Sequence, residues 1–311
     1  MLGEFVSAEQ YARLLQRGQQ DSEGWLQFDP AQMQSHYNRH PFLLQHRLNQ
    51  HPMFDIEPLF DLARRHPANK VLFRRGDIAP DADFEASFVR TDTELTLDHL
   101  LTHFEPLHGY ICISNPEQDA IYRPQIESLL AEITAHTHPL DPPHITWYST
   151  YVFISAQGAV TPYHMDREMN FLLQIRGEKT ADLWSQTDPL IMSPAQKDRL
   201  LAYEGTRPPY KPEFEQRALH FSLRPGLGLH HPFIAPHRVW THSNLSVSLA
   251  FTFRTRQSDR HTAAHQFNAR LRRIGLQNPK PVGESAWVDG AKAGSLHALQ
   301  RLRHPLQHAE H

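Results

Sequence analysis

The chain has 311 residues, of which 40% are hydrophobic and 21% charged, and its formal net charge is −3 at pH 7. This length supports a substantial hydrophobic core, and the near-neutral charge gives no indication of the basic surface that nucleic-acid binding uses. No apolar run approaches the roughly 20 residues of a membrane-spanning helix, and the first residues are too polar for a signal peptide. Cys112 is the single cysteine, which excludes an internal disulfide. We therefore expect a cytoplasmic protein without nucleic-acid or membrane partners.

The first 144 residues are predicted to be mainly helical. Apolar residues recur at helical spacing in three segments, 7–17, 54–63 and 124–133. Thr91 and Glu94 form a capping-box pair, which predicts a further helix that continues to Phe104. Residues 70–76 and 109–114 have the β-branched and aromatic content of strands.

From Thr146 onward the pattern is typical of strands. The expected strands cover 146–155, 169–175, 179–184, 228–234 and 245–253. Gly177 and Glu178 predict a tight hairpin turn in which Arg176 pairs with Lys179. One face of the last strand would carry only small side chains, which leaves room for a ligand inside a barrel: Ser246, Ser248, Ala250 and Thr252. Helices followed by strands indicate an α+β fold rather than alternating βαβ units.

Helical periodicity returns from Gln257 to the end of the chain. One apolar stripe contains Phe267, Leu271 and Ile274, and a second contains Leu296, Leu299 and Leu302. These stripes must be buried, either against the strands or against a second copy of the chain. A homodimer through the C-terminal helices is therefore one expectation.

His164 and Asp166 are candidate metal ligands because side chains two residues apart on a strand project from the same face. An imidazole and a carboxylate suit Fe(II), Mn(II) or Zn(II), and a distant second histidine would complete a two-His-one-carboxylate triad. Glu168 is an alternative carboxylate ligand.

The second histidine is not decided by the residues alone. Of the 23 histidines, four lie near predicted strand ends in the right region: His230, His231, His237 and His242. Lys179 begins the next strand, and the expected hairpin pairing with Arg176 would place it on the same face as Asn170, Leu172 and Gln174. A lysine in that position could bind the far carboxylate of a dicarboxylate such as 2-oxoglutarate.

The segment from Thr161 to Lys179 resembles a known family. Its order Thr-Pro-x-His-x-Asp-x-x-x-Asn-Phe, followed by Gln-Ile-x-Gly-x-Lys, is similar to the JmjC or cupin-8 branch of the Fe(II)/2-oxoglutarate oxygenases. That branch contains the asparaginyl hydroxylase that acts on hypoxia-inducible factor. The resemblance is ungapped over about twenty residues.

The resemblance implies roles for particular residues. His164 and Asp166 correspond to the first two iron ligands, and His237, in a Pro-His-x-Val sequence, corresponds to the third, with His231 as the alternative. Lys179 and Thr161 correspond to residues that hold the distal carboxylate of 2-oxoglutarate, Asn170 to a residue near its other end, and Tyr110 to a tyrosine of the same pocket. Arg254 is a competing anchor. Where the family has an asparagine on the last barrel strand, this chain offers Ala250 or Ser248.

The resemblance also implies an architecture. We expect a double-stranded β-helix over 145–255, a preceding helical region with a few strands over 1–144, and a C-terminal helical region over 256–311. The expected cofactors are Fe(II), 2-oxoglutarate and O2. The expected activity is a dioxygenase that hydroxylates a protein side chain or an amino-acid-like small molecule.

Two other functions remain open. A non-catalytic metal-binding cupin-like regulator would need a DNA-binding element, and the sequence shows neither a helix-turn-helix pattern nor a basic stripe. A cupin dioxygenase or isomerase without 2-oxoglutarate would need no lysine anchor. The charged segment 204–218, together with Arg167 and Arg238, is expected to border the mouth of the site and to favour an anionic or amide-rich substrate.

Overall fold

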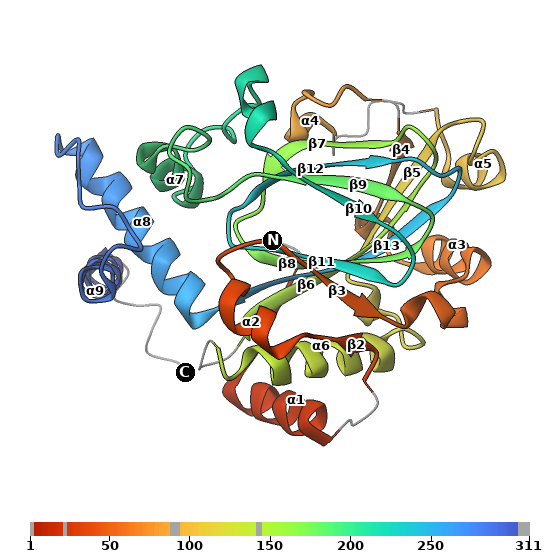
Figure 1. Cartoon of the computed structure of the whole chain (residues 1–311), viewed down its shortest axis with the longest axis horizontal. Coiled ribbons are helices and arrows are strands. Elements are labelled where there is room, and N and C mark those ends of the chain that lie inside the picture. The colour runs from red at the N-terminus through yellow and green to blue at the C-terminus, as the bar shows by residue number, and fades with distance from the viewer. Residues whose placement is uncertain (1–2, 21–23, 77, 88–93, 141–144, 304–311) are drawn as a thin grey trace. The chain divides into compact units, whose positions relative to one another are not determined.

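Eight successive strands, β6 to β13, form two facing antiparallel sheets (Figure 1). One sheet contains β6 (Ile145–Ser155), β8 (Met169–Arg176), β11 (Leu227–His231) and β13 (Ser246–Thr255). The other contains β7 (Val160–Met165), β9 (Lys179–Leu183), β10 (Leu219–Leu223) and β12 (Pro236–Thr241). The strand orders, β11-β8-β13-β6 and β10-β9-β12-β7, are those of a double-stranded β-helix. The predicted jelly roll is therefore confirmed.

The computed structural model describes residues 3–20, 24–76, 78–87, 94–140 and 145–303. The chain divides into two compact units, one formed by Met1–Gln186 with Pro209–Arg254 and the other by Thr187–Pro208 with Thr255–His311. The domain boundaries expected from the sequence stay a prediction.

Segments from the N-terminal half extend the larger sheet at both edges. β3 (Phe42–His46) pairs with β11, and β2 (Leu26–Gln27) pairs with β3. At the other edge β5 (Gly109–Ser114) pairs with β6 and β4 (Val71–Arg75) with β5, while β1 (Glu4–Phe5) also pairs with β6. The sheet thus has nine strands, five of them from the region before residue 145.

The turn after β8 is not the predicted hairpin. β8 pairs with β11 and β13, whereas β9 pairs with β10 and β12 of the opposite sheet. The expected pairing of Arg176 with Lys179 is therefore wrong. Gly177 has φ +66°, and a Cβ there would lie 2.3 Å from the Leu245 carbonyl oxygen. A glycine at a tight turn suits a crossing between sheets as well as a hairpin, so the local sequence could not distinguish them.

The first unit also carries helices. They are α1 (Ala8–Gln20), α2 (Pro30–His36), α3 (Ile56–Arg65), α4 (Phe84–Ser87), α5 (Leu97–Thr102) and α6 (Arg123–Thr137). Short 3-10 helices are η1 (Leu48–Gln50), η2 (Pro52–Phe54), η3 (Ala68–Lys70), η4 (Pro116–Gln118) and η5 (Pro212–Arg217). α6 buries the apolar residues that its periodicity predicted. α1 packs on α6 so closely that a Cβ at Gly18 would lie 2.1 Å from the Ala131 carbonyl oxygen.

The helix predicted to begin near Thr91 is shorter than expected. α5 begins after Thr96, whose hydroxyl accepts a 3.2 Å hydrogen bond from the His99 N–H. Thr91 lies outside the described residues. A later threonine, Thr96, is therefore the cap.

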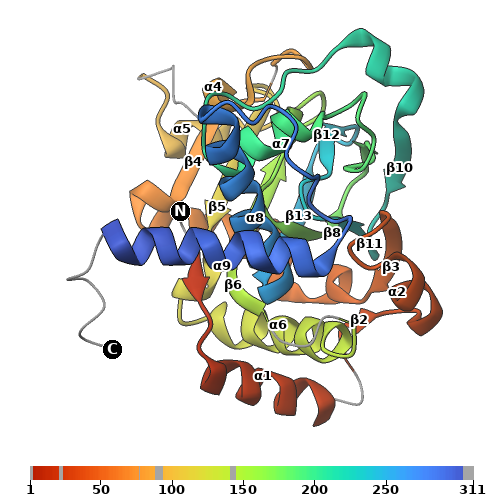
Figure 2. The same cartoon turned by 90° about the vertical axis from the view of Figure 1, so that its left-hand side faces the viewer.

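The second unit is helical, with α7 (Pro194–Leu201), α8 (Arg256–Arg273) and α9 (Ala286–Arg303); Figure 2 shows α8 and α9 crossing. The predicted apolar stripes are only partly buried. Ala263 of α8 packs with Ala293 and Leu296 of α9, whereas Ile274 and Leu302 are exposed. The helices meet through alanines, so the larger apolar residues near their ends remain on the surface.

The fold class is thus α+β, as predicted. Among the described residues, no helix has both the length and the apolar character needed to cross a membrane.

Candidate metal centre

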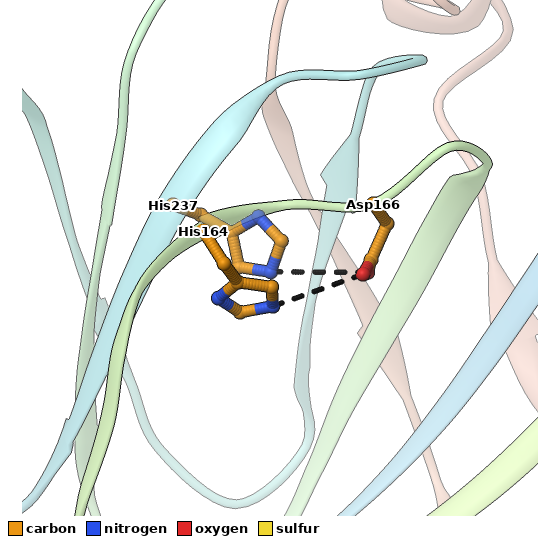
Figure 3. Close-up of side chains that lie close together, drawn as sticks. All are labelled: His164, Asp166 and His237. Carbon is orange, nitrogen blue, oxygen red and sulfur yellow. Dashed lines mark ion pairs between the residues drawn. The ribbon is translucent and has the colours of Figure 1, made fainter. Parts of the chain in front are cut away.

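The three predicted ligands lie together at one end of the barrel (Figure 3). His164 on β7 and His237 on β12 are directly paired in the sheet register, and Asp166 follows immediately after β7. One ligand atom from each lies within 4.8 Å of the other two, and within the described parts of the chain no other such group of three occurs. His164 Nε2 lies 3.8 Å from Asp166 Oδ1, and His237 Nε2 lies 4.0 Å from Asp166 Oδ2. These distances are too long for direct hydrogen bonds.

Backbone carbonyls fix both imidazoles. His164 Nδ1 donates to the Pro162 oxygen at 2.8 Å, and His237 Nδ1 donates to the Ala235 oxygen at 3.1 Å. Each Nε2 is therefore the unprotonated nitrogen that a metal requires, and it faces Asp166. Burial, followed by the neighbouring His237, lowers the pKa of His164, and burial raises the pKa of Asp166. Two neutral imidazoles and one carboxylate fit a divalent iron, manganese or zinc ion.

A β-bulge in β7 brings Thr161 onto the same face as His164. His237 pairs with His164 and Val239 pairs with Thr161, so two residues of β7 lie opposite Arg238 alone. In a regular strand, residues three apart point to opposite faces, and the extra residue restores them to one face. Both side chains therefore face the barrel interior together with Val239, which packs against the interior cluster.

Lys179 lies inside the barrel at the end opposite the triad. Its strand neighbours Ala181 and Leu183 belong to the interior apolar cluster, and alternation places Lys179 on the same face. The side chain is 5% exposed, and within the described residues it has no carboxylate partner. Burial lowers the pKa of Lys179 to about 7. A buried cation without a counter-ion is costly, so the site fits an anionic ligand.

Tyr110 and Thr161 lie near this end of the barrel. Tyr110 pairs in register with Ser155, and the Ser155 hydroxyl is 2.9 Å from that of Thr241, the strand partner of Lys179. The Tyr110 hydroxyl is buried, has no hydrogen bond of normal geometry among the described residues, and faces the Thr161 side chain. Burial raises the pKa of this phenol.

Asn170 lies at the metal end, on the larger sheet. Its register partners are His231 on β11 and Thr252 on β13, and all three are buried. Ala250 and Ser248, which the sequence offered in place of the family's asparagine, do not lie at this end; Thr252 does. Ala250 belongs to the apolar layer, and the Ser248 hydroxyl donates to Gln174 Oε1 at 2.7 Å. The register of β13 against β8 could not be read from either strand alone.

The competing ligands and anchor lie elsewhere. Glu168 is not part of the group that can hold a metal. Burial, and then the neighbouring Asp166, raise the pKa of Glu168 to about 7. Arg254 follows Thr252 on β13 and lies over the Trp147 ring, 4.7 Å from its centroid. It is thus beyond the metal end, far from Lys179 along the barrel.

Phe84 is a site residue that the sequence did not indicate. The ring of Phe84, in α4, stacks on the His164 imidazole with a centroid distance of 3.7 Å and an interplanar angle of 8°. A backbone hydrogen bond of 3.3 Å from the Tyr163 N–H to the Pro80 oxygen ties the preceding segment to β7. Phe84 lies in a polar, proline-containing stretch of the sequence, and no periodicity distinguishes it.

The expectation that Arg238 borders the mouth is wrong. Alternation places it on the outer face of the smaller sheet, opposite in direction to His237. Its guanidinium lies 4.2 Å from the Trp240 ring centroid and bonds to Asp182 and Glu215 at 2.9 and 2.7 Å. The charge is therefore neutralised, and Arg238 does not support an anionic substrate.

Part of the segment 204–218, which was expected to border the mouth of the site, packs on the same outer face. Trp184 Nε1 donates to the Phe214 carbonyl oxygen at 2.7 Å, and the rings of Tyr163 and Tyr210 contact each other edge to face.

No protein-family model matches the chain, and no curated protein matches its sequence. Solved structures of ycfD from Escherichia coli, described as a ribosomal oxygenase, are similar to it. One covers 92% of this chain and 69% of that chain at 14% identity, with a TM-score of 0.48. Another, in complex with cobalt and 2-oxoglutarate, covers 89% and 68% at 14% identity, with a TM-score of 0.39. At these scores the similarity carries no argument about function.

The fold assignment therefore rests on strand order and on the triad. The strand order is that of a double-stranded β-helix, so the fold implied by the resemblance is confirmed, and the three predicted ligands lie together.

Proposed function

We propose that this protein is an Fe(II)- and 2-oxoglutarate-dependent oxygenase. The observation that carries the proposal is the pair of sites at the two ends of one barrel interior. The triad of His164, Asp166 and His237 lies at one end, and the buried, uncompensated cation of Lys179 lies at the other.

The separation of the two ends suits a short dicarboxylate. Leu183 pairs with His237 at the triad level, and Lys179 is four residues earlier on the same strand. At the rise of a β-strand, this is roughly 13 Å between Cα positions. The extended lysine side chain crosses part of that distance, and the remainder accommodates a five-carbon chain with a carboxylate at each end.

The lining between the ends is also complementary to this ligand. The middle of the interior is apolar, with Leu172, Leu229 and Ala250 on the larger sheet and Ala181 on the smaller one. The ends are polar, with Asn170 near the triad and Thr161 and Tyr110 near the far end. A molecule with a hydrocarbon centre and two charged ends would satisfy all three zones.

A bound Fe(II) with 2-oxoglutarate would supply oxidative chemistry in which one atom of O2 enters a substrate C–H bond and the other enters succinate, with CO2 released from the co-substrate. The protein residues bind and orient. His164, Asp166 and His237 would hold the ion and leave coordination positions open, and Lys179 would hold the distal carboxylate. Phe84 covers one face of His164 and limits its contact with water.

The test is an anaerobic titration of Fe(II) and 2-oxoglutarate, followed by the visible charge-transfer absorption of the complex and then by succinate release in air. The wild-type chain should give the absorption band and His237→Ala should not. A band of equal intensity in the variant would show that His237 is not a ligand, and no band in the wild type would refute the proposal.

Lys179 also separates this proposal from the alternatives. A metal-binding regulator, or a cupin dioxygenase or isomerase without 2-oxoglutarate, would leave the buried ammonium without a partner. Full metal-dependent activity without any 2-oxoglutarate would favour such an enzyme.

For the substrate, we propose a peptide side chain or an amino-acid-like molecule. The support is the motif between Thr161 and Lys179, which resembles a protein hydroxylase. Consumption of 2-oxoglutarate that is stimulated by a small-molecule extract, but not by denatured cellular protein, would contradict a protein substrate.

A further inference from the structure

His231 is a buried histidine whose ring nitrogens make no hydrogen bonds to the described residues. Its side chain is 3% exposed, and neither ring nitrogen has a hydrogen-bond partner among the described residues. The neighbouring His230 differs, because both of its ring nitrogens have partners. His230 Nε2 accepts a hydrogen bond from the Asn38 backbone N–H, and His230 Nδ1 donates one to the Asn170 backbone carbonyl oxygen, both at 3.1 Å. A buried imidazole without partners is costly unless a ligand supplies them.

The position of His231 points its ring toward the metal centre. Alternation on β11 places it on the interior face with Leu229, and its ring meets that of His237 edge to face at 4.6 Å between centroids. It also pairs in register with Asn170, whose side-chain oxygen is likewise buried without a partner among the described residues. Two unsatisfied polar side chains thus lie side by side next to the triad.

His231 is not a fourth ligand in this geometry. The group of atoms that can share one ion contains His164, Asp166 and His237, and His231 is outside it. A role in packing does not explain the residue either, because its strand neighbour Leu229 and the facing Leu172 show that this interior accepts apolar side chains. The remaining role is contact with a molecule that enters the barrel.

That molecule is more consistent with the co-substrate than with the hydroxylated substrate. His231 is nearly inaccessible from outside, and the ligand proposed to extend inward to Lys179 is the dicarboxylate. A neutral imidazole always has one N–H to donate, and a carboxylate oxygen is its strongest ordinary acceptor in such a site.

We infer that His231 donates a hydrogen bond to the metal-proximal carboxylate of 2-oxoglutarate, beside the amide of Asn170. The inference rests on the proposed function and adds to it a binding residue that lies outside the motif shared with the oxygenases. His231 would thereby orient the end of the co-substrate that approaches the metal.

The test uses the full chain loaded with Mn(II), and measures the dissociation constant of 2-oxoglutarate by calorimetry and that of Mn(II) by its electron paramagnetic resonance signal. His231→Phe keeps a planar ring and removes the donor, whereas His231→Gln retains one. We expect His231→Phe to bind 2-oxoglutarate about ten to a hundredfold more weakly, the loss typical of a hydrogen bond to a charged group. Its Mn(II) affinity should be unchanged, and His231→Gln should recover part of the loss.

His230→Phe is the matched control. It removes hydrogen bonds one residue away on the opposite face of the strand, so it should lower the melting temperature and leave the affinity for 2-oxoglutarate unchanged. This control separates a general disturbance of β11 from loss of the proposed contact.

The outcomes distinguish the two proposals. If the wild-type protein does not bind 2-oxoglutarate, the proposed function fails and the role of His231 fails with it. If the wild type binds and His231→Phe binds equally tightly, only the role of His231 is wrong. A loss of Mn(II) affinity as large as the loss for 2-oxoglutarate would also overturn it, because His231 would then act by supporting His237.

Discussion

Two groups of buried polar side chains in this protein differ in whether their polar atoms have partners. In the helical unit Asp198 is 1% exposed and accepts hydrogen bonds from His265 at 2.7 Å, Asn268 at 3.3 Å and Arg272 at 2.9 Å. Inside the barrel, Lys179 has no carboxylate partner, and His231 has no hydrogen-bond partner, among the described residues. Both groups are therefore buried to a similar degree, but only the polar atoms of Asp198 have hydrogen-bond partners.

The difference indicates which group stabilises the fold and which one binds a ligand. A buried charge that is fully paired connects the helices that carry its partners. Removing it leaves those partners buried without an acceptor and lowers the stability of the fold. A buried charge that is unpaired destabilises the protein until a ligand of opposite charge arrives. Experiments that remove one member of each group should thus change different quantities.

The largest effect is expected for Asp198→Ala. It leaves the buried His265 and Asn268 and the partly buried Arg272 without their shared carboxylate, so the free energy of unfolding should fall by about 3 kcal/mol. Urea unfolding of the full chain measures this loss. Arg273→Ala is the control in the same unit: Arg273 forms an ion pair with Glu204, but its side chain is 63% exposed, and its loss should cost at most about 1 kcal/mol. Equal losses in the two variants would contradict the structural role of Asp198.

Lys179→Met should show the opposite pattern. Methionine fills a similar space without the charge, so affinity for 2-oxoglutarate in the Mn(II)-loaded protein should fall at least about a hundredfold. The ligand-free variant should be more stable than the wild type at neutral pH by a few kcal/mol or less, because the cost of burying an ammonium disappears. Calorimetric titration and thermal unfolding measure the two quantities. A destabilised variant would mean that Lys179 is a structural residue.

The pH dependence of ligand binding sharpens the same contrast. Burial lowers the pKa of Lys179 from 10.5 to about 7, so above neutral pH the ligand-free protein must take up a proton before it binds a dicarboxylate. Affinity should fall by about tenfold per pH unit above pH 7. Titrations in buffers of different ionisation enthalpy would measure the proton uptake, and no dependence between pH 7 and 9 would refute it.

Stability should depend on pH with a definite sign. Because the pKa of Lys179 is lower in the folded chain than in the unfolded one, the unfolded chain binds more protons between pH 7 and 10.5. The destabilisation due to Lys179 is therefore present below pH 7 and disappears as pH rises toward 10.5. The stability difference between Lys179→Met and wild type should shrink over that interval.

The smallest effect on folding is expected on α9. Trp287 and Leu302 are 82% and 79% exposed and lie on one helical face, since they are fifteen residues apart. Replacing both by serine should change the free energy of unfolding of the monomer by about 0.5 kcal/mol or less. If the homodimer expected from the sequence exists, the double variant should dissociate at higher protein concentration than wild type in sedimentation experiments. A monomeric wild type would contradict that expectation.

The sequence by itself predicted the features that depend on local spacing. The projection of His164 and Asp166 from one face and the alternation of small residues on the last strand both follow from the period of a strand, which depends only on neighbours in sequence. The stripe on α6 was predicted for the same reason, because helical periodicity acts within a few residues.

Only the tertiary structure decided which strands are neighbours. It showed that β8 and β9 belong to different sheets, that a bulge opposite Arg238 turns Thr161 inward, and that Thr252 rather than Ala250 lies beside Asn170. It also identified His237 as the third member of the triad, and it placed His231 beside the triad with no hydrogen-bond partner among the described residues for either ring nitrogen. Strand pairing, register and bulges are set by contacts between residues far apart in the chain, and a local pattern is compatible with several of these arrangements.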